Sequence, residues 1–144
     1  MPPRRILYAA TEIYTCFGER FQVGRTIERS RFESWLVGFA LSHDVATLDL
    51  TGAWPTRAGA SMVLASGPHS RARRWSQRIY EDYPAIEGLY YPSSMHANRP
   101  AVALYERAEA ALPGSPTFNR ALSDPLLDGV VAQACSVLGY DVRP

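Results

Sequence analysis

The stretch from Ile6 to Phe21 constrains the fold more than any other part of this chain. Its first part, Arg5 to Ala9, is a short apolar run rich in β-formers and predicts a strand. Thr11 is a candidate helix cap, and Glu12 would lie in the first turn, where the helix dipole favours a negative charge. The apolar residues that follow recur at helical spacing and predict a face that lies on the strand's sheet: Ile13, Phe17 and Phe21.

Glu19 falls two positions after Phe17 and two before Phe21. Two residues correspond to about 200° of helix rotation, so this carboxylate points away from the apolar face. It is then either a solvated surface glutamate or a group that lines a cleft beside the strand.

A second informative stretch carries a serine in a turn between two predicted strands. Gly88 to Pro92 and Ala101 to Tyr105 are the strands, and Ser93 and Ser94 begin the turn. Together with the Leu-Tyr-Ala-Ala-Thr block and the Phe-x-Glu of the first stretch, the Gly-Leu-x-Tyr-x-Ser and Ala-Leu-Tyr blocks resemble the RES domain family. The resemblance covers roughly Arg5 to Arg107.

That family is named after an arginine, a glutamate and a serine, and the members that have been studied are NAD-degrading toxins of bacterial toxin–antitoxin pairs. The resemblance implies a compact α/β domain similar to ADP-ribosyltransferase toxins. It also implies NAD as substrate, no separate cofactor, and a helical antitoxin partner that carries its own DNA-binding domain. Residue by residue, Tyr8 matches the family's site tyrosine, Glu19 its glutamate and Ser93 its serine. Ser93 is preferred to Ser94 because it lies two residues after Tyr91, as in the family pattern.

Cleavage of the nicotinamide–ribose bond builds positive charge on the ribose, so a nearby carboxylate and groups that hold the dinucleotide favour it. The predicted catalytic residues are Glu19 and Ser93, with Tyr8 and Tyr91 binding substrate and either phosphate or water as acceptor. Each has a structural alternative. Tyr8 can be a core aromatic, and Ser93 can be a turn residue. Tyr90 and Tyr91 point to opposite faces of their strand, so at least one of them is expected to pack in the core.

The family's arginines lie upstream of the Leu-Tyr block, and this chain has no residue that matches them. Arg4 and Arg5 are near the right strand but do not fit the position. We therefore expect one N-terminally short RES-like domain over residues 1–144, and the alternative function is an inactive module that only binds a partner protein. A sheet without its first strand would also leave an open edge, which favours pairing with another chain and hence a homo-oligomer.

Composition, net charge and missing motifs argue against several classes of function. The 144 residues include 47% hydrophobic and 20% charged residues, as in an ordinary globular domain, and the net charge of +1 predicts no direct nucleic acid or membrane binding. Two isolated cysteines, Cys16 and Cys135, exclude a disulfide framework. A signal peptide, clustered metal ligands and a Gly-x-Ser-x-Gly elbow are all missing from the sequence, which predicts a cytoplasmic protein without a metal site.

The remaining pattern predicts an α/β (α+β) fold with a mixed or antiparallel sheet and packed helices. A loop is expected over 23–31, then an antiparallel hairpin of strands 32–40 and 45–50 and a short helix within 56–66. A helix begins near Ser70 and exposes a basic face that is either solvated or binds anions, and His96 is expected to be an exposed loop residue. Asp124 and Pro125 begin a last helix, which ends at Gly139 and has this apolar stripe: Leu126, Leu127, Val130, Val131, Ala134 and Leu138.

Overall fold

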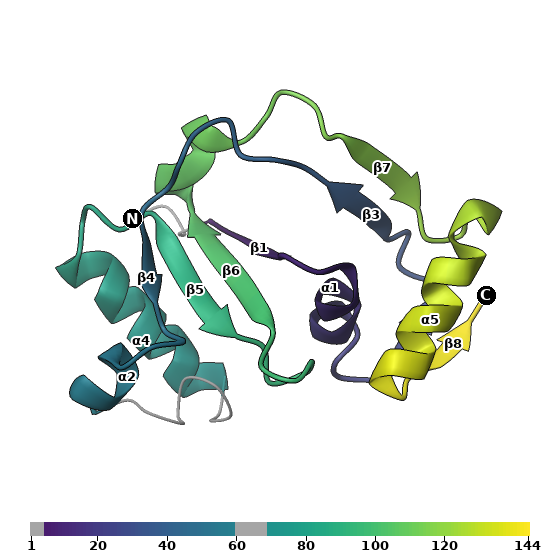
Figure 1. Cartoon of the computed structure of the whole chain (residues 1–144), viewed down its shortest axis with the longest axis horizontal. Coiled ribbons are helices and arrows are strands. Elements are labelled where there is room, and N and C mark those ends of the chain that lie inside the picture. Colours follow the sequence, from purple (N-terminus) through teal and green to yellow (C-terminus); the bar gives the residue numbers. More distant parts are fainter. Residues whose placement is uncertain (1–4, 60–68) are drawn as a thin grey trace.

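The computed structural model describes residues 5–59 and 69–144 and is built on a four-stranded mixed sheet (Figure 1). β6 pairs antiparallel with both β1 and β5, whereas the outer strand β4 runs parallel to β5. In spatial order the strands are β1 (Ile6–Ala10), β6 (Pro100–Tyr105), β5 (Gly88–Pro92) and β4 (Thr47–Asp49). The predicted fold class, a mixed sheet with packed helices, is confirmed.

One end of the molecule is formed by this sheet and the helices α2 (Trp54–Arg57) and α4 (His69–Asp82). Figure 1 shows both helices beside β4 and β5. Ile79 of α4 is buried among sheet residues of the same cluster, including Leu89 and Tyr105. The predicted helix after residue 70 is thus confirmed, and its core-facing residue is one that the helical spacing identified.

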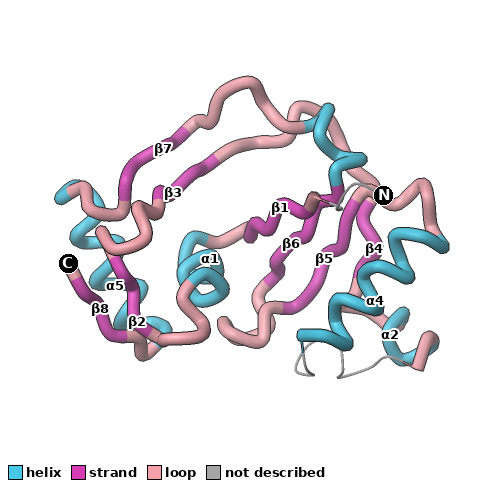
Figure 2. The backbone as a smooth tube through the Cα atoms, turned by 180° about the vertical axis from the view of Figure 1, so that it is seen from behind, coloured by secondary structure: helices cyan, strands magenta, loops and turns pink. Residues whose placement is uncertain are grey.

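The other end has its own core, in which α1 (Ile13–Arg20) packs against α5 (Asp128–Leu138). A short parallel pair, β2 (Thr26–Glu28) and β8 (Asp141–Arg143), lies beside these helices in Figure 2. The buried side chains of this cluster are Phe17, Phe21, Ile27, Leu122, Leu127, Val131, Ala134 and Tyr140. Gly139 ends α5 with φ +68, a left-handed conformation that favours glycine.

A two-stranded antiparallel arm links the two ends. It consists of β3 (Trp35–Gly38) and β7 (Phe118–Ala121), and Figure 1 shows it arching over β1 and α1. Two 3₁₀ helices flank β7 in the chain, η1 (Glu106–Ala111) and η2 (Pro125–Leu127).

Two predictions about strands are wrong. The strands expected to form a hairpin pair elsewhere, because β3 pairs with β7 and β4 pairs with β5. The segment 23–31, predicted as a loop, contains β2, whose Ile27 is fully buried. Three residues are too few to show a periodic pattern, and the partner strand β8 lies more than a hundred residues later, so local sequence carried no signal for this pair.

Several details of the helices also differ from prediction. Glu12, not Thr11, is the N-cap residue of α1, and its side chain makes no cap hydrogen bond because it is directed to Arg99. The apolar face of α1 packs on α5 instead of on the sheet of β1, and Ile13 stays 37% exposed. Leu126 lies in η2, which precedes α5, and not in the last helix as predicted. Its side chain points outward and is 70% exposed.

Two further elements shift the predicted boundaries. The short helix expected within 56–66 is observed as α2 at Trp54–Arg57, and the part of that prediction from residue 60 onward lies outside the described residues. Asp124 caps η2 by accepting a hydrogen bond from the Leu126 amide, as expected for an Asp-Pro helix start. Over the described ranges, no helix combines the length and apolar character needed to cross a membrane.

Candidate active site

The polar face of α1 carries the predicted glutamate. Glu12, Thr15 and Glu19 follow one another at spacings of three and four residues, so their side chains lie on one side of the helix. Phe17 and Phe21 lie on the opposite side, buried in the core with α5. The prediction that Glu19 points away from the apolar face is therefore confirmed.

The predicted serine begins a tight loop between β5 and β6. The Ser93 amide donates to the Arg99 carbonyl (2.8 Å), and the Asn98 amide donates to the Ser93 carbonyl (3.0 Å), which closes the loop on itself. Ala97 and Asn98 adopt φ values of +47 and +57, which reverse the chain within a few residues. Ser93 itself is fully buried.

The structure brings these two residues into direct contact. The Ser93 hydroxyl donates a hydrogen bond of 2.6 Å to Oε1 of Glu19, and the Met95 amide donates to the same hydroxyl oxygen (3.3 Å). A short hydroxyl-to-carboxylate bond is charge-assisted and strong. Ser93 therefore fixes the orientation of a glutamate that lies 74 residues earlier in the chain.

Tyr91 lies next to this pair. Burial raises the pKa of its phenol strongly, and the nearby Glu19 carboxylate and Tyr8 and Cys16 add to the shift. The direction is expected, because both a low dielectric and a neighbouring negative charge disfavour the phenolate. Tyr91 thus stays protonated at neutral pH and is a hydrogen-bond donor close to Glu19.

Tyr8 projects from the same face of the sheet as Tyr91. Tyr8 lies opposite Ala103, and Tyr91 lies opposite Ala101, two residues earlier in β6. Because side chains alternate along a strand, these positions share one face. The Tyr8 ring is 64% exposed, which answers the alternative that it is a core aromatic. All four predicted site residues therefore lie in one region, with Tyr8 at its solvent-exposed side.

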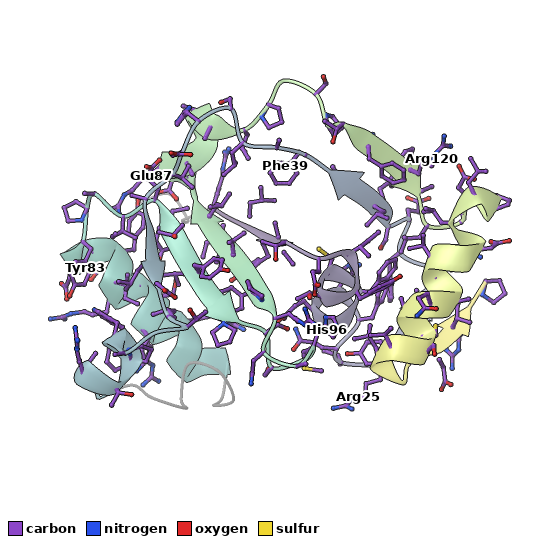
Figure 3. All side chains as sticks on the ribbon, viewed as in Figure 1. Arg25, Phe39, Tyr83, Glu87, His96 and Arg120 are labelled. Carbon is purple, nitrogen blue, oxygen red and sulfur yellow. The ribbon has the colours of Figure 1, made fainter. Side chains whose placement is uncertain are left out.

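Two further contacts join α1 to the loop and were missed by sequence reasoning. Thr15 Oγ1 lies 2.8 Å from Nδ1 of His96, and Arg99 donates to Oε1 of Glu12 at 3.2 Å. The His96 side chain is only 13% exposed, so the expectation of an exposed loop histidine is wrong; Figure 3 shows it beside α1. The spacing of Glu12, Thr15 and Glu19 is a signal on the helix side, but nothing in the loop sequence indicates which residues face them.

Cys16 connects the site with a small pocket of about 90 Å³ between α1 and β3. Burial raises the pKa of its thiol, and the Glu19 carboxylate adds to this, so the thiol stays protonated. A second pocket of about 180 Å³ lies between β1, β6 and η1. Neither pocket is lined by Glu19 or Ser93, so the site is defined by its side-chain contacts and not by either of these cavities.

Comparison with known protein families identifies the family of the chain. The family model described as RES domain matches residues 2–124. The chain belongs to the RES domain family. The matched region contains Glu19, Ser93 and both tyrosines, whereas all of α5 and all of β8 lie beyond it. The RES domain is associated with NAD-acting enzymatic toxins and generally pairs with antitoxins. No curated protein and no solved structure matches the chain significantly.

Proposed function

We propose that this RES domain acts as the toxin of a toxin–antitoxin pair and degrades NAD by cleaving its nicotinamide–ribose bond. The observation that carries the proposal is the 2.6 Å hydrogen bond from Ser93 to Glu19, next to a partly buried, protonated Tyr91. It supplies a carboxylate of fixed orientation, which is the group that this chemistry needs most.

The proposed reaction separates charge at the ribose. The bond between C1′ and the nicotinamide nitrogen breaks, and its electron pair neutralises the positively charged ring, so nicotinamide leaves without a general acid. The ribose then carries oxocarbenium character, and an oxygen of water or of inorganic phosphate forms the new bond to C1′, with loss of its proton to solvent when water attacks. A preorganised carboxylate beside C1′ stabilises this transition state electrostatically.

In this proposal the four residues have different roles. Glu19 faces the developing cation. Ser93 is fully buried and bound to Glu19, so we assign it as a positioning residue that acts through the carboxylate. The Tyr91 phenol donates a hydrogen bond to a ribose hydroxyl, and the exposed ring of Tyr8 stacks on nicotinamide or on the ribose edge.

The proposed partner is a helical antitoxin. Arginines on α4 supply a surface that an acidic antitoxin segment would fit, since Arg73 and Arg74 are exposed. Arg78, also exposed, is bridged to Asp82 at 2.8 Å and contributes less positive charge. Charge complementarity of this kind favours fast association of the two proteins.

The test is the concentration of NAD over time with the purified protein, with and without inorganic phosphate. We expect NAD to fall and nicotinamide to appear in equal amounts. A phosphorylated ADP-ribose product would identify phosphate as acceptor, and free ADP-ribose would identify water. Glu19→Ala should abolish the loss. NAD that stays constant with folded wild-type protein would contradict the proposal and leave a RES module that only binds a partner.

A further inference from the structure

We propose that Thr15 and His96 are positioning residues that attach the 93–99 loop to α1 at a second point and so hold Ser93 against Glu19. This inference rests on the proposed function for its effect on NAD cleavage. The attachment itself is a property of the fold and is testable without any activity.

The contact between the two side chains is direct and shielded from solvent. Thr15 is fully buried, and its Oγ1 lies 2.8 Å from Nδ1 of His96, whose side chain is 13% exposed. Either tautomer of the imidazole satisfies the bond, because a hydroxyl can both donate and accept. A buried polar pair of this kind is costly to break on one side only, since the remaining partner is left without its hydrogen bond.

His96 is coupled to Ser93 through the loop backbone. The Arg99 amide donates to the His96 carbonyl (2.8 Å), and the Ser93 amide donates to the Arg99 carbonyl (2.8 Å). The His96 amide also donates to the Ser93 carbonyl, at a longer 3.4 Å. A displacement of His96 therefore moves the residue whose hydroxyl holds Glu19.

The two attachment points lie one helical turn apart. Thr15 and Glu19 are separated by four residues, so their side chains point from the same face of α1. One hydrogen bond leaves the loop free to rotate about it, whereas two bonds at this separation fix its orientation. Gly18 lies between them, and a Cβ there would meet the Met95 carbonyl at 3.5 Å, so the loop backbone also approaches the helix closely.

Charged groups at the start of α1 reinforce the attachment. Arg99 donates to Oε1 of Glu12 at 3.2 Å, while Oε2 of Glu12 lies 3.9 Å from Nδ1 of His96. This Oε2 atom is buried and has no hydrogen-bond partner within the described part of the chain. The Glu12 carboxylate thus lies beside both His96 and Arg99 and holds the loop close to the start of α1.

The test compares Thr15→Val, which removes the hydroxyl at nearly constant shape, with Thr15→Ser, which keeps it. Thr47→Val on β4 is the matched control, and His96→Asn breaks the same contact from the loop side. We expect Thr15→Val and His96→Asn to lower kcat for NAD cleavage about tenfold with KM within about twofold, because a buried hydrogen bond is lost. Thr15→Ser, which keeps the hydroxyl, and Thr47→Val should both retain the wild-type kcat.

Amide hydrogen exchange provides the readout that does not depend on activity. In Thr15→Val and His96→Asn the amides of Ser93, Asn98 and Arg99 should exchange about tenfold faster, whereas those of α5 keep their wild-type rates. Wild-type exchange in this loop would overturn the attachment, and wild-type kcat with a loosened loop would overturn its role in positioning. If the wild-type protein does not cleave NAD, the proposed function fails, and the exchange rates alone still decide whether the attachment exists.

Discussion

The two faces of α1 use their contacts in different ways. Phe17 and Phe21 are 3% and 5% exposed and pack against the α5 side of the molecule, where apolar contacts are non-directional. Thr15 and Glu19 on the other side each meet one partner atom at hydrogen-bond distance, 81 and 74 residues along the chain. One face thus anchors the helix, and the other presents a carboxylate in a defined orientation. On this short helix, the side chains packed in the core and the side chain whose carboxylate is oriented by Ser93 thus lie on different faces.

The largest expected effect comes from removing the charge on the polar face. Glu19→Gln keeps an oxygen that can accept from Ser93 but loses the negative charge that, in the proposed reaction, faces the developing cation. We expect NAD cleavage to fall about a thousandfold, or roughly 4 kcal/mol, with an unchanged thermal midpoint. The measurement is nicotinamide release under single-turnover conditions. A loss of less than about threefold would show that the charge is not used.

A substitution on the apolar face of α1 should lower stability and leave NAD cleavage almost unchanged. Phe17→Ala leaves a cavity between α1 and α5 and should lower the free energy of unfolding by about 3 kcal/mol, as measured by urea denaturation. Cleavage per folded molecule should stay close to wild type, because the polar contacts are made on the other side of the helix. A large loss of kcat in fully folded Phe17→Ala would break the distinction between the two faces.

The hydroxyl that orients Glu19 should have a smaller effect than the charge itself. Ser93→Ala removes the 2.6 Å bond and should slow NAD cleavage about thirtyfold, or roughly 2 kcal/mol. Ser94→Ala is the matched control, because Ser94 is the exposed neighbour in the same turn. The measurement is the steady-state rate of NAD cleavage by both variants. An equal loss of rate in Ser93→Ala and Ser94→Ala would mean that the turn as a whole matters and not the Ser93 hydroxyl.

The smallest expected effect concerns the phenol beside the carboxylate. Tyr91→Phe should slow cleavage about fivefold, or roughly 1 kcal/mol, because the proposed hydrogen bond to a ribose hydroxyl is lost. Tyr90→Phe removes a hydroxyl from the opposite face of the same strand and should leave the rate unchanged. Since burial raises the pKa of Tyr91, the ratio between wild type and Tyr91→Phe should stay constant from pH 6 to about pH 9. A ratio that changes over this range would show that Tyr91 titrates.

The sequence predicted the elements that depend on local pattern. Helical spacing identified Phe17, Phe21 and Ile79 as core residues, and the same geometry placed Glu19 on the opposite face of its helix. The two strands on either side of the Ser93 turn were also predicted, because Gly88 to Pro92 and the run after Pro100 are rich in β-formers.

What could not be predicted depends on which distant segments meet. β3 pairs with β7 and β2 with β8, and neither pairing leaves a mark in local periodicity. The same holds for His96 and Arg99, whose partners Thr15 and Glu12 lie more than eighty residues earlier. Ser93 and Glu19 were placed together only through the family resemblance, and periodicity alone would have left each a surface residue.

The most direct test of the central idea, that Glu19 and Ser93 act as one unit in NAD cleavage, is a double-mutant cycle on nicotinamide release. If Ser93 acts only through the carboxylate, adding Ser93→Ala to Glu19→Gln should cause no further loss of rate, so that the double variant cleaves NAD as fast as Glu19→Gln alone. A double variant that is slower by the full factor of Ser93→Ala would contradict the account, because the two residues would then contribute independently.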